Sequence, residues 1–157
     1  LTAKHHDGFA LYPSKFTEHS VAKSPWKQGK GDVVRELANA CKRYGLKLGI
    51  YLSPWDRFHP DYGTDSYNQV YANMQKELLT QYGPIFEFWY DGANGEGPNG
   101  KKQVYDWKLF HSMVNQYQPQ AVQFSDNGPD IRWVGNERGF SYEKMWSPIN
   151  KDEIYPG

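Results

Sequence analysis

The sequence lacks most of the features that would tie the chain to a particular partner or compartment. There is one cysteine, Cys41, so an internal disulfide and a zinc site built on cysteines are both excluded. The 18 Lys and Arg balance 18 Asp and Glu, which leaves no basic excess for nucleic acid or an acidic membrane surface. No apolar run approaches the length that spans a bilayer, and no signal-peptide pattern is present. The sequence therefore predicts no nucleic-acid partner and no membrane insertion.

Aromatic side chains are abundant, at 17% of the 157 residues, with 12 Tyr and 6 Trp. Much of this excess suits core packing, but its spread through predicted turns also suits a surface that stacks on the apolar faces of sugars. The length suffices for one domain with a hydrophobic core. Because the chain starts at Leu1 within a predicted strand and stops at 155–157 without a closing element, we expect a fragment of a longer protein.

Residues 86–92 (Phe-Glu-Phe-Trp-Tyr-Asp-Gly) form a short apolar run that ends in a glycine-rich turn, which predicts a buried strand. Side chains alternate along a strand, so its two faces differ. One face carries Phe86, Phe88 and Tyr90 toward helices, and the other carries Glu87, Trp89 and Asp91. An isolated Asp-Gly pair commonly marks a plain turn. Chemistry gathers at the C-terminal tips of parallel strands, however, and this makes Asp91 the first candidate functional residue.

Strands and helices alternate along the rest of the chain. Apolar residues three and four apart predict a helix from 33 to 44, with Asp32 as its N-cap, Gly45 as its stop and a buried stripe that ends at Tyr44. Residues 127–157 show little periodicity and many turn residues. Two more helices are predicted around 67–82 and over 107–117, and further strands over 1–9, 46–54 and 121–126.

This alternation predicts parallel strands joined by right-handed crossovers. Each strand has one bulky apolar face, such as the alternate positions from Leu46 to Leu52, and one face with small or polar groups. The central strands of a doubly wound sheet are covered by helices on both faces and are apolar throughout, so this pattern fits a barrel lumen better. An eight-stranded (β/α)8 barrel needs roughly 250 residues. We therefore expect a partial TIM-like barrel of about four βα units, with residues 1–157 forming part of one barrel domain whose earlier and later strands are missing.

The predicted strand tips bring polar and aromatic side chains to one end of this barrel. The set lacks a phosphate-binding glycine loop and a serine nucleophile elbow. Two carboxylates in an aromatic-lined polar pocket suit glycoside hydrolysis, in which one attacks the anomeric carbon and the other protonates the leaving oxygen. The set comprises His5, His6, Asp7, Tyr51, Ser53, Trp55, Trp89, Asp91, Ser125, Asp126 and residues 130–137.

His5, His6 and Asp7 have a second interpretation, as metal ligands at the mouth of a barrel. Adjacent residues of a strand point to opposite sides, and the other three histidines fall in predicted loops or a helix. Two alternatives remain: structural rings bonded to backbone, and donors to a sugar hydroxyl. The resemblance described next favours the sugar contact, and we predict neither a metal nor a cofactor.

Several separate motifs, in the right order, resemble the α-L-fucosidases of glycoside hydrolase family 29. The resemblance covers most of residues 1–92 and resumes at 128–139. It implies a (β/α)8-like barrel, retention of configuration, a fucosylated oligosaccharide or glycoconjugate as substrate, and a secreted, periplasmic or lysosomal location. The motifs are His-His-Asp-Gly-Phe at 5–9, Tyr-Pro-Ser-Lys at 12–15, Ser-Pro-Trp at 24–26, Gly-Asp-Val-Val at 31–34, the run from Tyr44 to Pro54, and Glu-Phe-Trp-Tyr-Asp-Gly at 87–92.

Carried over position by position, the resemblance implies roles for individual residues. The nucleophile of the family lies at the tip of the strand that carries Trp-x-Asp, which is Asp91 in this sequence. The implied substrate contacts are His5 and His6 with fucose hydroxyls, Tyr51 close to the nucleophile and Trp89 along the apolar side of the sugar. We add Trp55 as a substrate contact from its place at a neighbouring strand tip.

Residues 128–137 (Gly-Pro-Asp-Ile-Arg-Trp-Val-Gly-Asn-Glu) resemble the branch of the family that acts on α-1,3/1,4-linked fucose. In that branch the acid/base falls at Glu137, with Arg132 and Trp133 near the site. We therefore expect a retaining exo-glycosidase that hydrolyses terminal α-1,3/1,4-fucosidic bonds by double displacement. The alternatives are a barrel that binds sugar without cleaving it and a retaining exo-glycosidase for another sugar, such as an α-galactoside. The competing acid/base carboxylates are Glu96 and Glu143.

Overall fold

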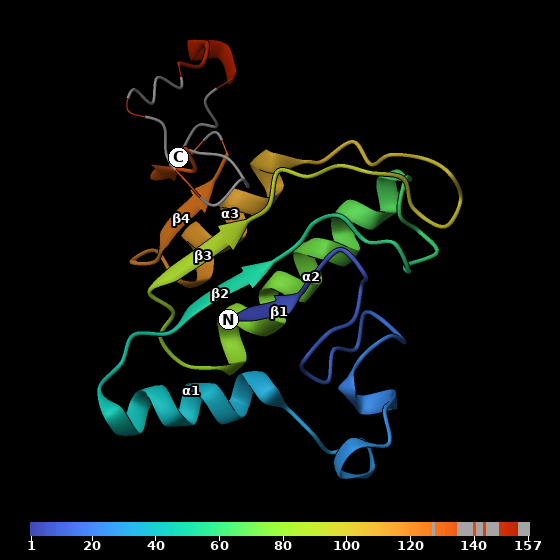
Figure 1. Cartoon of the computed structure of the whole chain (residues 1–157), viewed down its shortest axis with the longest axis vertical. Coiled ribbons are helices and arrows are strands. Elements are labelled where there is room, and N and C mark those ends of the chain that lie inside the picture. Colours follow the sequence, from blue (N-terminus) through green and yellow to red (C-terminus); the bar gives the residue numbers. More distant parts are fainter. Residues whose placement is uncertain (127, 135–139, 141–142, 144–147, 154–157) are drawn as a thin grey trace.

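The structure is a computed structural model that describes residues 1–126, 128–134, 140, 143 and 148–153. Within these residues, five strands form one parallel sheet in the order β1-β2-β3-β4-β5. The arrowheads of β1 to β4 point the same way in Figure 1, so the predicted parallel arrangement is confirmed. The strands are β1 (Thr2–Lys4), β2 (Gly49–Leu52), β3 (Glu87–Tyr90), β4 (Val122–Ser125) and β5 (Ile131–Arg132).

The helices alternate with these strands as the sequence predicted. Helices α2 and α3 pack against each other and lie behind the sheet in Figure 1, while α1 runs below its lower edge. Each strand pairs with the next strand along the chain. This sequential order lacks the reversal that marks a doubly wound sheet. The helices are α1 (Val33–Tyr44), α2 (Asp65–Gln81) and α3 (Trp107–Tyr117), with short 3-10 turns η1 (Val21–Lys23), η2 (Trp26–Gly29) and η3 (Lys151–Glu153).

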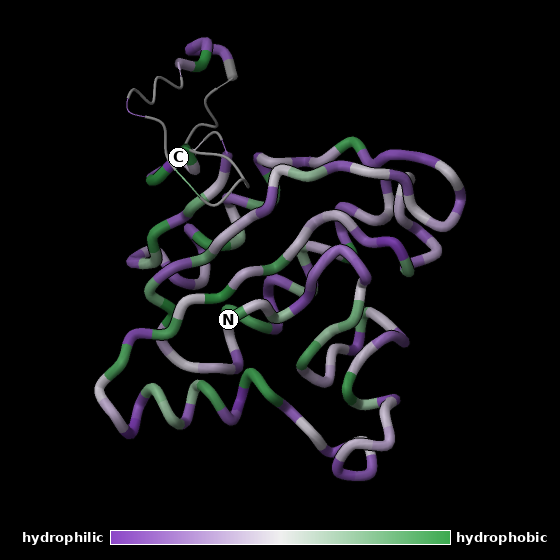
Figure 2. Tube along the Cα trace, viewed as in Figure 1, coloured by the Kyte–Doolittle hydropathy of each residue, from purple (hydrophilic) through white to green (hydrophobic). Residues whose placement is uncertain are grey.

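Helix α1 has the bounds that its capping residues predicted. The Asp32 carboxylate accepts a hydrogen bond from the Arg35 N–H at 2.8 Å, and Gly45 ends the helix at a φ of 68°. Figure 2 shows hydrophobic and hydrophilic residues alternating along this helix. The predicted stripe is wrong at its last position, because Tyr44 is 68% exposed. Periodicity specifies which face of a helix is apolar, but not how far the neighbouring elements reach along that face.

The hydrophobic core lies between the sheet and helices α2 and α3. Two residues predicted to face this core, Leu46 and Phe86, are 67% and 46% exposed. Both precede the paired parts of β2 and β3. The alternation of apolar and polar residues in the sequence therefore begins before the residues at which the strands are buried. The sheet contributes Ile50, Leu52, Phe88 and Tyr90 to the core, and the helices contribute Tyr71, Met74, Leu78, Phe110 and Val114.

Strand β5 was not predicted, because residues 127–157 carry little periodicity. It pairs Ile131 with Phe124 and Arg132 with Ser125. The Asp130 carboxylate accepts from the Gln123 N–H at 2.8 Å and fixes the approach to β4. A two-residue strand has no pattern of its own, so its existence depends on the hydrogen bonds that β4 supplies. No helix in the described part of the chain is both long and apolar enough to cross a membrane.

Candidate active site

The Asp91 carboxylate follows the C-terminal end of β3 and is held by two donors. The Tyr51 hydroxyl, from the adjacent strand β2, donates to Oδ2 at 2.7 Å, and the Ala93 N–H donates to Oδ1 at 2.8 Å. Tyr51 is adjacent because the β2–β3 register pairs it with Trp89. Burial, together with the hydrogen bond and charge of Asp91, raises the pKa of Tyr51 above its ordinary value, so the phenol stays a neutral donor. Each carboxylate oxygen thus has a donor that fixes its orientation.

His6 lies on the other side of this carboxylate, with Nε2 3.9 Å from Asp91 Oδ2. Its Nδ1 is 2.7 Å from the Ser53 hydroxyl, which itself donates to the Trp55 carbonyl at 3.0 Å. The direction of the hydrogen bond between His6 Nδ1 and Ser53 depends on the tautomer of the ring. Burial lowers the pKa of His6, partly offset by the charge of Asp91, which favours the neutral ring. In the tautomer with the proton on Nδ1, Nε2 carries a lone pair and can accept from a sugar hydroxyl. In the other tautomer, Nε2–H donates, which is the role predicted from the sequence.

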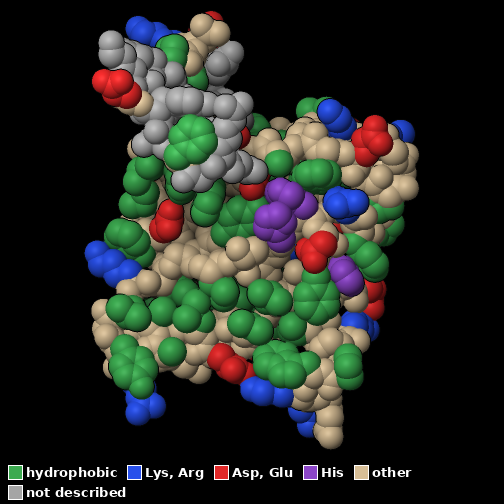
Figure 3. Space-filling view, in the orientation of Figure 1, with side chains coloured by type: hydrophobic (Ala, Val, Ile, Leu, Met, Phe, Trp, Pro, Cys, Tyr) green, Lys and Arg blue, Asp and Glu red, His purple; other side chains and the backbone are tan. Residues whose placement is uncertain are grey.

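Aromatic rings surround the carboxylate. The Trp89 indole meets the Tyr51 ring edge-on at 5.1 Å and stacks on Phe124 at 5.0 Å. His5 stacks on Tyr51 at 5.6 Å, and His6 lies 4.7 Å from the Trp55 ring. Figure 3 shows histidine side chains gathered beside acidic and apolar ones on this face. The structure therefore brings together Asp91 and five predicted substrate contacts, and it provides flat apolar surfaces of the kind that pack on a sugar ring.

The loop after Asp91 folds back over Trp55. The indole Nε1–H donates to the Glu96 carbonyl at 3.1 Å, and a Cβ on Gly95 would lie 2.0 Å from the indole, so only glycine fits there. The Tyr62 hydroxyl donates to the Gly95 carbonyl at 3.1 Å and anchors the same loop. The backbone of Glu96 is thus brought close to the site, while the residue itself is exposed.

A second carboxyl lies beside the tip of β3. Asp126, at the end of β4, approaches the chain so closely that a Cβ on Gly92 would lie 1.9 Å from its Oδ2. Burial and the nearby charge of Asp91 raise the pKa of Asp126 above its ordinary value. The sequence placed Asp126 among the strand tips, but only the register of β3 and β4 shows that its charge acts on Asp91.

The remaining predicted residues lie along β5 and beyond it. Arg132 pairs with Ser125, and the Trp133 N–H donates to the Ser125 carbonyl at 2.8 Å, so both lie beside the tip of β4. The predicted acid/base, Glu137, falls outside the described residues. Its competitor Glu143 is described and is exposed. The identity of the acid/base therefore stays a prediction from the sequence.

Two charged residues that sequence reasoning missed, Lys4 and Asp56, lie beneath the site, and both are fully buried. The only signal in the sequence was a lysine directly before the His-His pair. Across the described part of the chain, no three His, Cys, Asp or Glu side chains gather as a metal would need. A cavity of about 660 Å³ lies elsewhere, before the starts of β2 and β3, lined by Leu46, Pro84, Phe86 and residues of α1. It contains none of the predicted site residues.

Comparison with known proteins finds related sequences and structures. The family model described as Alpha-L-fucosidase matches residues 1–151. The chain is 51% identical to "Alpha-L-fucosidase 1" of Arabidopsis thaliana over 152 residues, covering 96% of this chain and 30% of that protein. Among solved structures, a glycoside hydrolase 29 family member from an unknown rumen bacterium is 50% identical with a TM-score of 0.83, covering 96% of this chain and 29% of the other.

A Ruminococcus gnavus GH29 fucosidase in complex with fucose is 32% identical with a TM-score of 0.80, covering 98% of this chain and 36% of the other. The chain thus spans about a third of the length of the relatives it matches. The parallel sheet and these likenesses confirm the predicted fold, a partial (β/α)8 TIM-like barrel.

Proposed function

We propose, since this chain belongs to the alpha-L-fucosidase family, that it supplies the catalytic centre of an enzyme that hydrolyses terminal α-L-fucosidic bonds in fucosylated glycans. Residues 1–157 would then form part of one catalytic barrel domain of the full-length protein. The observation that carries the proposal is the Asp91 carboxylate at the tip of β3, oriented by Tyr51 and Ala93 and facing His6.

In the proposed reaction, Asp91 attacks the anomeric carbon of the fucoside and forms a fucosyl ester. The two donors to Asp91 aim its oxygens, and the raised pKa of Tyr51 keeps that phenol neutral and donating. Glu137 gives a proton to the leaving oxygen and then removes one from the water that cleaves the ester. A retaining mechanism places the two carboxyl groups about 5–5.5 Å apart. His6 Nε2 accepts from a fucose hydroxyl, and Trp89 covers the apolar side of the ring.

The α-1,3/1,4 linkage is the finer part of the proposal. It is supported by residues 128–137, which resemble the branch of the family that acts on branched glycans. The placement of Arg132 and Trp133 beside the tip of β4 is compatible with contacts to a sugar that carries the fucose.

Fucose release by the full-length protein tests this proposal. The substrates are an α-1,3/1,4-fucosylated branched oligosaccharide, an aryl α-L-fucoside and, as the control, an aryl α-galactoside. We expect release from both fucosides, none from the galactoside, preference for the branched glycan, and α-L-fucose as the first anomer seen by NMR. Cleavage of the galactoside alone would reassign the sugar. Saturable fucose binding without release from either substrate would favour a binding barrel.

Tyr51→Phe tests the donor to the nucleophile. Loss of a hydrogen bond to a charged group costs about 1.5–3 kcal/mol, so kcat for the aryl fucoside should fall by roughly ten- to a hundredfold. The matched control is Tyr71→Phe, which also removes a 2.7 Å hydrogen bond, in that case to the Leu52 carbonyl in the core. It should lower the melting temperature and leave kcat of the folded protein unchanged. Equal kcat losses in both variants would show that the Tyr51 hydroxyl has no special part in turnover.

A further inference from the structure

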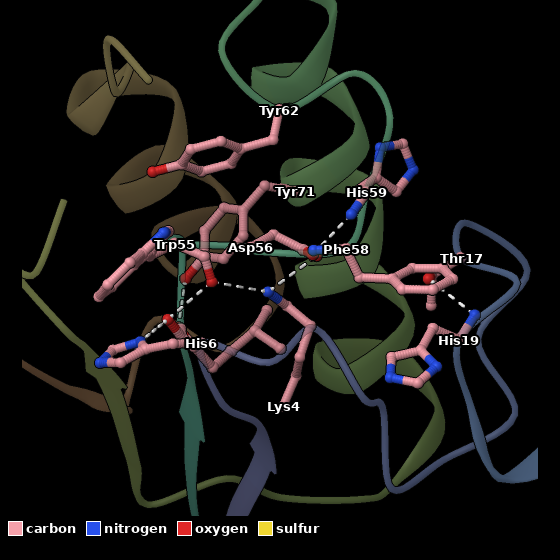
Figure 4. A network of polar contacts seen from close by, with 12 residues as sticks. Lys4, His6, Thr17, His19, Trp55, Asp56, Phe58, His59, Tyr62 and Tyr71 are labelled. Carbon is pink, nitrogen blue, oxygen red and sulfur yellow. Dashed lines mark hydrogen bonds and ion pairs between the residues drawn. The ribbon is translucent and has the colours of Figure 1, made fainter. Parts of the chain in front are cut away.

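A buried ion pair lies between the two loops that carry the site. Lys4 Nζ is 3.2 Å from Asp56 Oδ2, and both side chains are almost completely shielded from water. Lys4 ends β1, directly before His5 and His6, and Asp56 follows Trp55 after β2. Figure 4 shows Lys4, Trp55, Asp56 and His6 in one connected cluster.

Every polar group of this pair has a partner. Lys4 Nζ also approaches the Trp55 carbonyl at 3.4 Å and the Tyr67 hydroxyl at 3.5 Å. Asp56 Oδ2 accepts from Tyr67 at 3.3 Å, and Oδ1 accepts from the backbone N–H groups of Phe58 and His59 at 2.9 and 2.8 Å. Burial alone would raise the pKa of Asp56, but the charge of Lys4 and these hydrogen bonds outweigh it and lower that pKa. Burial lowers the pKa of Lys4, opposed by the charge of Asp56. Each charge therefore stabilises the other, and the loss of either partner is costly.

The pair is connected to the site through one carbonyl group. The Trp55 carbonyl accepts from Lys4 and also from the Ser53 hydroxyl at 3.0 Å. The Ser53 hydroxyl oxygen in turn lies at hydrogen-bond distance, 2.7 Å, from His6 Nδ1. The backbone supports the same arrangement, because the Arg57 N–H donates to the His6 carbonyl at 2.8 Å. An unbroken series of contacts thus runs from Asp56 through Lys4, Trp55 and Ser53 to the imidazole.

We propose that the Lys4–Asp56 ion pair is a positioning device for substrate binding: it fixes the Trp55 carbonyl, through it the Ser53 hydroxyl, and so holds His6 as the Nδ1–H tautomer with Nε2 accepting from the sugar. The fit around the pair is close. A Cβ on Gly8, at a φ of +80°, would lie 2.4 Å from Asp56 Oδ1, so the turn after the two histidines packs directly on the carboxylate. This inference rests on the function proposed above. Lys4 and Asp56 are shielded from water and therefore act through His6.

The test uses the full-length protein with Asp56→Asn. We expect the inhibition constant of free L-fucose and the KM of the aryl fucoside to rise about tenfold, with a smaller change in kcat, because displacement of a binding group by a fraction of an ångström is enough for such a loss. Nitrogen NMR of the histidine rings, with the His6 signals assigned from His6→Gln, should show loss of the single Nδ1–H tautomer. If the unsubstituted protein cleaves no fucoside, the function proposed above fails, and the tautomer signal alone decides the positioning claim.

The matched control is Glu77→Gln. Glu77 is another buried carboxylate, which accepts from the Ser14 hydroxyl at 2.7 Å and the Lys15 N–H at 2.9 Å and ties a different loop to α2. The Glu77→Gln substitution should lower the melting temperature, while KM, the inhibition constant of fucose and the His6 signals stay unchanged. Tyr67→Phe is the milder variant in case Asp56→Asn does not fold. It removes one hydroxyl from the pair, and we expect a severalfold rise in KM with the same tautomer change.

A double-mutant cycle with Ser53→Ala separates positioning from general stability. If Asp56 acts through Ser53, then Asp56→Asn should change fucose affinity less than twofold when Ser53 is already Ala. Independent, multiplying losses would overturn the proposal, as would Asp56→Asn or Tyr67→Phe proteins that keep both the original tautomer and the original fucose affinity. Equal losses in Glu77→Gln would overturn it too.

Discussion

Asp91→Asn in the full-length protein should lower kcat for an aryl α-L-fucoside by about three orders of magnitude or more, because removal of a reacting group has effects of at least this size. An amide is a poor nucleophile and forms no fucosyl ester. Its single carbonyl oxygen can keep only one of the two hydrogen bonds that Tyr51 and Ala93 donate to Asp91. KM should change little, since asparagine has nearly the same size and shape as aspartate. Steady-state kinetics and circular dichroism on the same sample measure the two parts of this prediction.

Glu87→Gln is the matched control for Asp91. Glu87 is a carboxylate at the other end of β3, two alternations away on the same face of the strand, and it is partly buried. It should keep nearly full activity. A stricter test is Asp91→Ala with azide, which can enter the vacated space, attack the anomeric carbon and expel the aryloxide, giving the β-fucosyl azide. Near-normal turnover of Asp91→Asn would show that Asp91 is not the nucleophile.

Glu137→Ala should affect substrates according to their leaving groups. General acid catalysis typically contributes about 10²- to 10⁴-fold, so release from the branched oligosaccharide should fall by that factor. An aryl fucoside with a good leaving group needs little protonation and should lose far less in the first, ester-forming step. Single-turnover measurements on both substrates separate that step from hydrolysis of the ester.

Glu96→Ala and Glu143→Ala are the controls for this assignment, because Glu96 and Glu143 are the other candidates for the acid/base. Neither should show a dependence on the leaving group. If Glu96→Ala shows it instead, the acid/base moves to the loop that Trp55 holds through the Glu96 carbonyl. Equal losses of Glu137→Ala on both substrates would point to a structural contribution.

The sequence predicted those parts of the fold that depend on neighbours along the chain. Helix α1 begins after Asp32 and ends before Gly45 as expected, since both caps act within one helical turn. The alternation in 86–91 correctly placed Phe88 and Tyr90 in the core. The same alternation wrongly predicted burial of Phe86. The exposure of Phe86 depends on where neighbouring elements begin to cover β3, and no residue in the run 86–91 determines that point.

The candidate site shows the same division. The motif at the end of β3 marked Asp91 as the candidate nucleophile, and the resemblance predicted that Tyr51 lies near it. The donor contact of Tyr51 with Asp91 depends on the register between β2 and β3, which brings together residues 40 positions apart. The Lys4–Asp56 pair joins residues from two strand ends, and neither residue has a distinctive pattern of its own.

By itself, then, the sequence determined the order of strands and helices, the caps of α1, the family and the chemical types available at the strand tips. These follow from local backbone preferences and from short motifs. The tertiary structure alone decided that the Trp55 carbonyl is shared by Lys4 and Ser53, that His6 lies between Ser53 and Asp91, and that Asp126 packs on Gly92 within range of the charge of Asp91. The reason is physical: hydrogen-bond direction and electrostatic interaction depend on distances of a few ångströms between strands, and strand register sets those distances.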